Sequence, residues 1–189
     1  GRMWFGTEEG ISIYDGVHTK VYKLSKFHRQ NANPIGNQTH FIAGDKDGNV
    51  FFDSDQSLIR YDIQTQKFSC LRKSNVYTVA SIKGTIWVGI ADSILTWNPD
   101  KNDFDFVTRL ENRNQRATCL LEDSGGRYWI GTTDGLFRMN DDKSLTCMIM
   151  GEDIYDLYED SKYNLWISIR MNGMYKRDVH LSLIHISEP

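Results

Sequence analysis

The stretch GRYWIGTTDGLFRMN (residues 126–140) decides the fold of this chain, because the chain repeats it. Four other segments follow the same pattern: GRMWFGTEEGISIYD from Gly1, GNVFFDSDQSLIRYD from Gly48, GTIWVGIADSILTWN from Gly84 and NLWISIRMNGMYKRD from Asn164. An aromatic residue stands at the same point of each copy: Trp4, Phe51, Trp87, Trp129 and Trp166. The spacings between them are 47, 36, 42 and 37 residues. Such a period indicates one structural unit that is stacked several times along the chain.

Each unit has the pattern of four short strands joined by tight turns. An apolar first strand precedes the aromatic, as in VYTVASI from Val76 and ATCLL from Ala117. A turn rich in Gly, Asp and Asn follows, and these residues tolerate the positive φ of hairpin turns. The second strand carries the aromatic, and a third and a looser fourth strand come after it. No window of the sequence keeps the i, i+3, i+4 apolar spacing of a helix, so helices are not expected.

Four antiparallel strands at this period are typical of a propeller blade. The sequence therefore predicts an all-β fold, a β-propeller fragment of about four and a half four-stranded blades in an incomplete ring, over residues 1–180. The aromatics at the repeat position mark the blade centres, and we interpret them as core between blades, because a ligand is rarely repeated fivefold. Both ends of the chain fall inside a repeat, so we expect the natural protein to be longer in both directions.

The tail LSLIHISEP (residues 181–189) breaks the repeat pattern where a fourth strand is expected. It resembles the translation of a transposase-end adapter used in sequencing libraries. We interpret it as a non-native, adapter-derived tail. A genuine short apolar strand is the alternative.

Composition and motifs narrow the classes of function. Lys and Arg number 22 against 25 Asp and Glu, a net charge of −3, and no basic patch suggests a nucleic-acid partner. No run approaches the roughly 18 apolar residues of a membrane span. The sequence contains no GxSxG, HExxH or P-loop pattern. Its five histidines have no metal-ligand spacing, and His40 is expected to be an ordinary strand residue. We therefore expect no catalytic residue, no metal and no cofactor.

Polar loops are the expected place for recognition, because rigid strands present them outside the repeat constraint. Residues 28–38 and 111–116 each link a fourth strand to the next first strand, on the same face as the turns between second and third strands. Their amides, guanidinium groups and carboxylates suit a polyhydroxylated ligand, and they equally suit solvated loops. The ligand-binding candidates are His28, Arg29, Asn31, Asn33, Arg113, Arg116, Asp134, Arg170 and Asn172.

The units at residues 122–140 and 159–178 resemble the two-component regulator propeller repeat, whose usual pattern is ExDxxGxLWIGTxxGLxxYD. The fourth copy matches this pattern best, and the first and fifth match it well. The second copy departs from it, because Phe51-Phe52-Asp53-Ser54 replaces the Trp-Ile-Gly-Thr run. The third has Gly89-Ile90-Ala91 in place of Gly-Thr. These departures question the turn geometry in two blades.

The resemblance implies the periplasmic sensor region of a hybrid two-component histidine kinase of the Bacteroidetes type. Such receptors commonly detect oligosaccharides and signal to transcription. The fragment itself would then be non-catalytic, and the full-length protein would be the kinase. The implied partners are an oligosaccharide, the remaining blades of the same chain and a second copy in a homodimer.

Two other functions stay open at this point. A propeller enzyme similar to streptogramin lyases would need His and acidic residues that converge on the central channel, where the innermost strands offer chiefly His40. A propeller could also serve only as a scaffold for protein interaction.

Overall fold

The computed structural model describes residues 2–8, 10–23, 38–54, 57–112, 114–177 and 183–186. Within these ranges the chain forms strands and turns and no helix. The strands make five antiparallel sheets, each built from strands that are consecutive in the sequence. We call the sheets blades 1 to 5 in chain order. In the described ranges, no helix with the length and hydropathy to cross a membrane is present.

The strand bounds follow the repeat. Blade 1 contains β1 (Met3–Thr7), β2 (Gly10–Tyr14) and β3 (Thr19–Tyr22). Blade 2 contains β4 (Ile42–Gly44), β5 (Val50–Ser54), β6 (Ser57–Asp62) and β7 (Lys67–Arg72). Blade 3 contains β8 (Val76–Ile82), β9 (Thr85–Ile90), β10 (Ser93–Asn98) and β11 (Asp103–Arg109). Blade 4 contains β12 (Ala117–Glu122), β13 (Tyr128–Thr132), β14 (Gly135–Met139) and β15 (Leu145–Met150). Blade 5 contains β16 (Ile154–Glu159), β17 (Leu165–Ile169), β18 (Met174–Arg177) and β19 (Leu183–Ile186).

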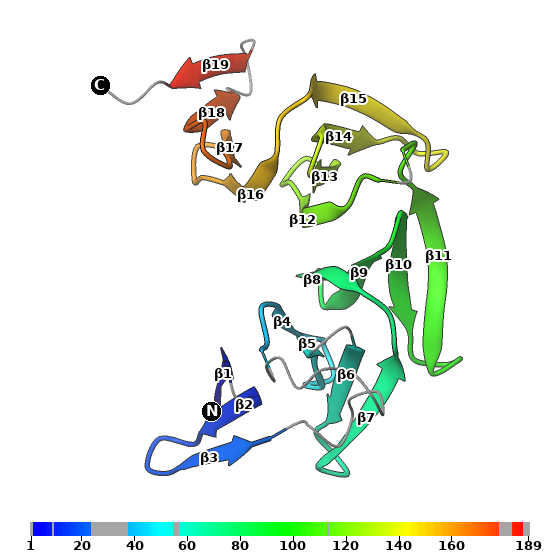
Figure 1. Ribbon diagram of the computed structural model, residues 1–189. Helices are drawn as coiled ribbons and strands as arrows, with labels where there is room; N and C mark the ends of the chain where they lie inside the picture. The colour runs from blue at the N-terminus through cyan, green and yellow to red at the C-terminus, as the bar shows by residue number, and fades with distance from the viewer. Residues whose placement is uncertain are drawn as a thin grey trace.

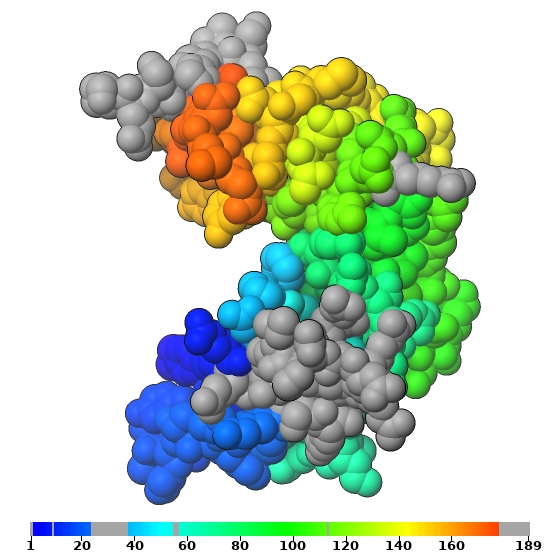
Figure 2. Space-filling view, in the orientation of Figure 1, coloured from blue at the N-terminus to red at the C-terminus, as the bar shows by residue number. Residues whose placement is uncertain are grey.

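The five blades follow an open arc (Figure 1). The first strands β4, β8, β12 and β16 lie along its concave side, and the fourth strands β7, β11 and β15 lie along its outer side. The space-filling view shows the concave side open between blade 1 and blade 5 (Figure 2). The predicted fold class, an all-β propeller fragment that does not close into a ring, is confirmed.

The turns between first and second strands need left-handed backbone, as their composition predicts. In blade 3, Lys83 and Gly84 have φ of 49° and 76°, which closes the hairpin in two residues. Gly126 has φ of 78° in blade 4. In blade 5 the corresponding turn uses Tyr163, with φ of 64°. The departure in blade 3 is also accommodated by positive φ, since Ala91 has φ of 53° after β9.

An aspartate in this turn holds the repeated tryptophan in place. In blade 4, Asp123 accepts hydrogen bonds from the backbone N–H and the Nε of Arg127, at 2.9 and 2.6 Å. It also accepts one at 2.8 Å from the indole Nε1 of Trp129. Asp160 accepts the indole hydrogen bond of Trp166 at 2.9 Å in the same way. The indole N–H is therefore satisfied while its rings pack against apolar neighbours, which a buried tryptophan requires.

Apolar clusters between neighbouring blades form the core. Phe51 lies in one cluster with Trp97 of blade 3, and their ring centroids are 5.2 Å apart. Trp87 packs with Phe137 and other residues of blade 4. Trp129 is 1% exposed and packs with blade 5. Each of these aromatics thus joins its own blade to the next one along the chain.

The aromatics of the two end blades are less buried. Trp4 is partly buried and meets Tyr61 of blade 2, with ring centroids 4.8 Å apart. Trp166 is partly buried, and the ammonium of Lys176 lies 5.5 Å above its ring. In blade 5, β19 pairs with β18 in the place of the fourth strand, within the tail at residues 181–189. The adapter origin of that tail stays a prediction.

Candidate functional site

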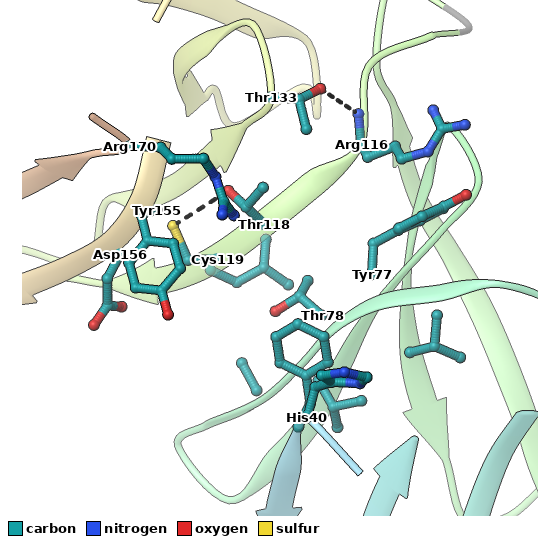
Figure 3. A pocket seen from close by; sticks show the side chains of 15 residues that line it. His40, Tyr77, Thr78, Arg116, Thr118, Cys119, Thr133, Tyr155, Asp156 and Arg170 are labelled. Atoms are coloured by element: carbon teal, nitrogen blue, oxygen red, sulfur yellow. Dashed lines mark hydrogen bonds between the residues drawn. The ribbon is translucent and has the colours of Figure 1, made fainter. Parts of the chain in front are cut away.

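A cavity of about 710 Å³ opens on the concave side of the arc. Its walls come mainly from the first strands β8, β12 and β16 of three consecutive blades, with His40 and Phe41 ahead of β4 (Figure 3). The cavity is within the size range of ligand sites. It is the natural candidate for a binding site in this part of the chain.

A β-bulge recurs at the same point of each first strand that walls the cavity. The register shifts between Val76 and Thr78 in β8, between Ala117 and Cys119 in β12, and between Ile154 and Asp156 in β16. A bulge leaves one residue outside the ladder and re-aims its side chain. The residues left over are Tyr77, Thr118 and Tyr155, and all three line the cavity.

His40 occupies the corresponding position in blade 2. It stands two residues before Ile42, which pairs with Phe52, just as Tyr77 stands two residues before Val79, which pairs with Val88. His40 also lines the cavity. We call His40, Tyr77, Thr118 and Tyr155 the inner collar. One position in each of blades 2 to 5 therefore supplies a side chain to a shared cavity.

Two arginines contact the rings of the tyrosines of the inner collar. The guanidinium of Arg116 lies 4.8 Å from the ring centroid of Tyr77, and that of Arg170 lies 5.1 Å from the ring centroid of Tyr155. The two pairs stand on opposite sides of the cavity, and Thr118 lies between them (Figure 3). Tyr155 is 59% exposed, so its ring is available to a ligand. The arrangement offers aromatic surface and hydrogen-bond donors together, which suits a ligand with both apolar faces and polar edges.

The backbones that carry these arginines are tied to their own blades. Arg116 donates its backbone N–H to Oγ1 of Thr133 at 3.3 Å and accepts the backbone N–H of Thr133 at 3.1 Å. Arg170 donates its backbone N–H to the carbonyl of Asp153 at 2.8 Å and its Nε to Oδ2 of that residue at 3.0 Å. The two guanidinium groups are therefore presented from fixed positions.

His40 has a carboxylate partner that sequence reasoning missed. Asp53 takes the place that Gly89 and Gly131 hold in the next two blades. Its Oδ2 lies 3.0 Å from Nδ1 of His40, and its Oδ1 accepts the backbone N–H groups of His40 and Phe41 at 2.8 and 2.7 Å. These bonds replace ladder hydrogen bonds, which explains why β4 is shorter than β8. The departure in the second repeat thus changes strand pairing; residues 55 and 56 of its turn lie outside the described ranges.

The residues at the floor of the cavity offer no reactive nucleophile. Thr78 is buried, and Thr118 donates its hydroxyl to the carbonyl of Ile154. Burial raises the pKa of the Cys119 thiol to about 12. A thiol with this pKa stays protonated at neutral pH and is a poor nucleophile. In the described ranges, no group of three or more His, Cys, Asp or Glu side chains is placed to hold a metal ion.

The structure brings two of the predicted ligand-binding residues together, since Arg116 and Arg170 both line the cavity. Asp134 lies in the turn before β14, where its Oδ2 is 3.5 Å from Nε2 of Gln115. Asn172 donates to the carboxylate of Glu152 at 3.2 Å. Neither of them lines the cavity. The other candidates lie outside the described residues: His28, Arg29, Asn31, Asn33 and Arg113.

Comparison with known proteins tests the resemblance found in the sequence. Residues 113–134 match the two-component regulator propeller repeat. The resemblance is confirmed over this segment, which runs from the loop before β12 to the turn before β14. No curated protein matches the chain.

Solved structures of propellers align with the whole chain or nearly so. The extracellular domain of a protein assigned as a hybrid two-component system from B. thetaiotaomicron aligns with 100% of the chain at 19% identity and a TM-score of 0.69. PorZ, a bacterial surface component of the type-IX secretion system of Porphyromonas gingivalis, aligns with 94% at 14% identity and a TM-score of 0.67. Virginiamycin B lyase from Staphylococcus aureus aligns with 100% at 14% identity and a TM-score of 0.76.

These structures differ in how much of them the chain covers. The chain spans 32% of the extracellular domain of the hybrid two-component system, 31% of PorZ and 67% of the lyase. At these identities the likeness shows the fold alone. The chain is thus a propeller that resembles both two-component sensor ectodomains and streptogramin lyases.

Proposed function

We propose that this chain is part of the ligand-binding propeller of an extracytoplasmic two-component sensor, and that the cavity at the inner collar binds an oligosaccharide. The observation that carries the proposal is that two tyrosines, each with an arginine over its ring, line one cavity. Sugar rings present apolar faces to aromatic rings and hydroxyl edges to charged and amide groups. Tyr77 and Tyr155 supply the first kind of contact, and Arg116, Arg170 and Asp156 the second.

Binding without turnover accounts for the inert floor of the cavity. Thr118 and Cys119 contribute shape rather than reactivity, because the threonine hydroxyl is donated to a backbone carbonyl and the thiol is protonated. In the full-length receptor the ligand would act on a homodimer in the periplasm of a Bacteroidetes-type bacterium. It would shift the dimer between two arrangements that bind it with different affinity, and the kinase would pass this change to transcription.

The proposal is tested by replacing one exposed tyrosine of the cavity. Isothermal titration calorimetry against a panel of plant and host oligosaccharides should give saturable heat with the unaltered chain. Tyr155→Ala should weaken that binding by about 1–3 kcal/mol, the range of a lost aromatic contact in a binding site. Tyr158→Ala is the matched control, because Tyr158 is 64% exposed on the same strand and does not line the cavity. Equal affinities for both variants, or no heat across the panel, would contradict the proposal.

A second function is favoured by one contact, the His40–Asp53 pair. A carboxylate that fixes the Nδ1 side of an imidazole leaves Nε2 to act as a general base. The pair lies at the cavity of a propeller whose fold resembles virginiamycin B lyase. Incubation with a streptogramin B antibiotic and mass analysis of the product decides between the two. If the chain opens the ring of the antibiotic and His40→Ala does not, the chain is a lyase. If the antibiotic is unchanged, the lyase function is excluded and the sensor proposal stands.

A further inference from the structure

Arg116 differs from Arg170 and His40, the other basic side chains of the cavity, because it has no carboxylate partner in the described part of the chain. Its Nη1 donates to the carbonyl of Asn114 at 2.9 Å, and its guanidinium carbon lies 4.8 Å from the ring centroid of Tyr77. The side chain is half-buried. Partial burial has therefore removed some of the water around the guanidinium, and one neutral carbonyl oxygen has replaced it as a hydrogen-bond acceptor.

Of the other charged groups that line the cavity, the two basic side chains are paired, and Asp156 has no cationic partner in the described ranges. Arg170 is paired with Asp153, and His40 is paired with Asp53. The carboxylate of Asp156 is exposed on blade 5, where its Oδ1 accepts the backbone N–H of Leu157 at 2.8 Å. Figure 3 shows Asp156 on the Tyr155 side of the cavity and Arg116 on the Tyr77 side. The cavity is therefore polarised, with its uncompensated positive charge next to Tyr77.

The contact with Tyr77 and the hydrogen bond to Asn114 place the Arg116 guanidinium at the wall of the cavity. A guanidinium has five N–H donors in a planar fork that matches the two oxygens of a carboxylate, and one Nη1 N–H of Arg116 is used by the carbonyl of Asn114. Carboxylates and sulfates bind such a fork through two parallel hydrogen bonds, which a sugar hydroxyl cannot form.

We propose that the oligosaccharide bound at the inner collar is acidic, and that Arg116 holds its carboxylate or sulfate group beside Tyr77. The inference rests on the proposed function and adds the ligand class to it. The sugar ring that carries the acid lies against Tyr77. The next ring reaches Tyr155, where Arg170 and Asp156 meet neutral hydroxyls. In this arrangement Arg116 alone determines the preference for an acidic over a neutral oligosaccharide.

The test is calorimetry on the intact chain with matched sets of trisaccharides. Each set holds a neutral sugar, its uronate form and its sulfated form, and galactotriose with trigalacturonate is the first pair. At low ionic strength the acidic members should bind at least tenfold more tightly than the neutral member, the fold-change of one charge-assisted hydrogen bond. The uronate and sulfate arms identify which oxyanion the site prefers. Added salt should reduce the difference.

Arg116→Gln should abolish the preference for acidic members and leave the affinity for neutral members within about twofold. Lys67→Gln removes the same charge from the exposed start of β7, outside the cavity, and should change neither affinity. Asp156→Asn should not reduce the preference. The melting temperature of each variant checks that the fold is kept, since Arg116→Gln removes the hydrogen bond to Asn114 and the contact with Tyr77.

The outcomes separate the two proposals. Neutral and acidic members that bind equally would overturn the acidic-ligand inference and leave the sensor proposal standing. An equal loss in Arg116→Gln and Lys67→Gln would show unspecific charge attraction and would also overturn the inference. If no member of any set binds, both proposals are wrong.

Discussion

At the scale of single residues, the aspartate of the first turn fixes the repeated tryptophan in blades 4 and 5. Asp123 is 4% exposed and receives three hydrogen bonds, one of them from the indole of Trp129. Burial by itself raises the pKa of Asp123, but hydrogen bonds from Trp129 and Arg127, together with the Arg127 charge, outweigh it and lower the pKa below its usual value. The ionised form is therefore favoured by folding.

Replacing this carboxylate should lower stability in a pH-dependent way. Asp123→Asn should cost about 2–3 kcal/mol at pH 7, because hydrogen bonds to a charged acceptor are weakened. Since the folded pKa is the lower one, the stabilisation is full above the unfolded value near 4 and is lost as pH falls through the folded pKa. Urea unfolding at pH 7 and at pH 3 measures the effect, and the difference between the proteins should shrink at pH 3. Asp100→Asn, in an exposed turn, is the control and should be neutral at both values.

At the scale of the strand, the glycine after the aromatic lets one blade approach the next. A Cβ built on Gly131 of β13 would lie 2.8 Å from Cγ2 of Ile154 in β16 and closer still to Sγ of Cys119. The same position in β9, Gly89, would place a Cβ 2.9 Å from Ala117 of the next blade. Glycine is needed here for packing rather than for backbone freedom, since neither position requires positive φ.

Gly131→Ala should therefore destabilise the chain by about 1–3 kcal/mol through overpacking between blades 4 and 5. Gly44→Ala at the end of β4 is the matched control, because a Cβ there meets only the carbonyl of Asn49, at 3.8 Å. Equilibrium unfolding in urea compares the two variants. A neutral Gly131→Ala together with a costly Gly44→Ala would contradict the packing of the blades described here.

The repeat pattern was enough to predict the strands but not the cavity. The aromatic spacing and the turn composition located β9, β13 and their hairpins, because alternation and turn chemistry are local properties. The inner collar was not predicted, because a bulge depends on pairing with the neighbouring strand and leaves no mark in VYTVASI or ATCLL. Polar loops were favoured instead, and among the described candidates only Arg116 and Arg170 line the cavity. Comparing the second residue of each first strand would have found Tyr77, Thr118 and Tyr155.

At the scale of the whole molecule, the blades form a linear array in which each core is shared by two neighbours. Trp129 joins blades 4 and 5, as Phe51 joins blades 2 and 3. The stability of such an array is close to a sum of blade and interface contributions. A destabilising substitution at one interface should therefore loosen mainly the two blades that share that interface.

Trp129→Ala should cost about 3–5 kcal/mol locally, as for other large aromatic residues removed from a core. Hydrogen–deuterium exchange read by mass spectrometry should show faster exchange in the strands of blades 4 and 5 and unchanged exchange in β5 and β6 of blade 2. Trp166→Ala, at the end of the arc, should have the smaller effect of the two. Uniformly faster exchange in every blade would mean that the array unfolds as a single cooperative unit.

The bulge of each first strand has an evolutionary consequence. A residue that takes no part in the ladder can be exchanged without breaking a backbone hydrogen bond or opening the seam between two blades. Tyr77 and Tyr155 are such residues, whereas the Thr118 hydroxyl donates to the carbonyl of Ile154 in the next blade. The aromatics that secure the blades lie on the adjacent strands. Single substitutions at these positions can therefore change which ligand the concave surface binds, and the packing between blades needs no compensating change.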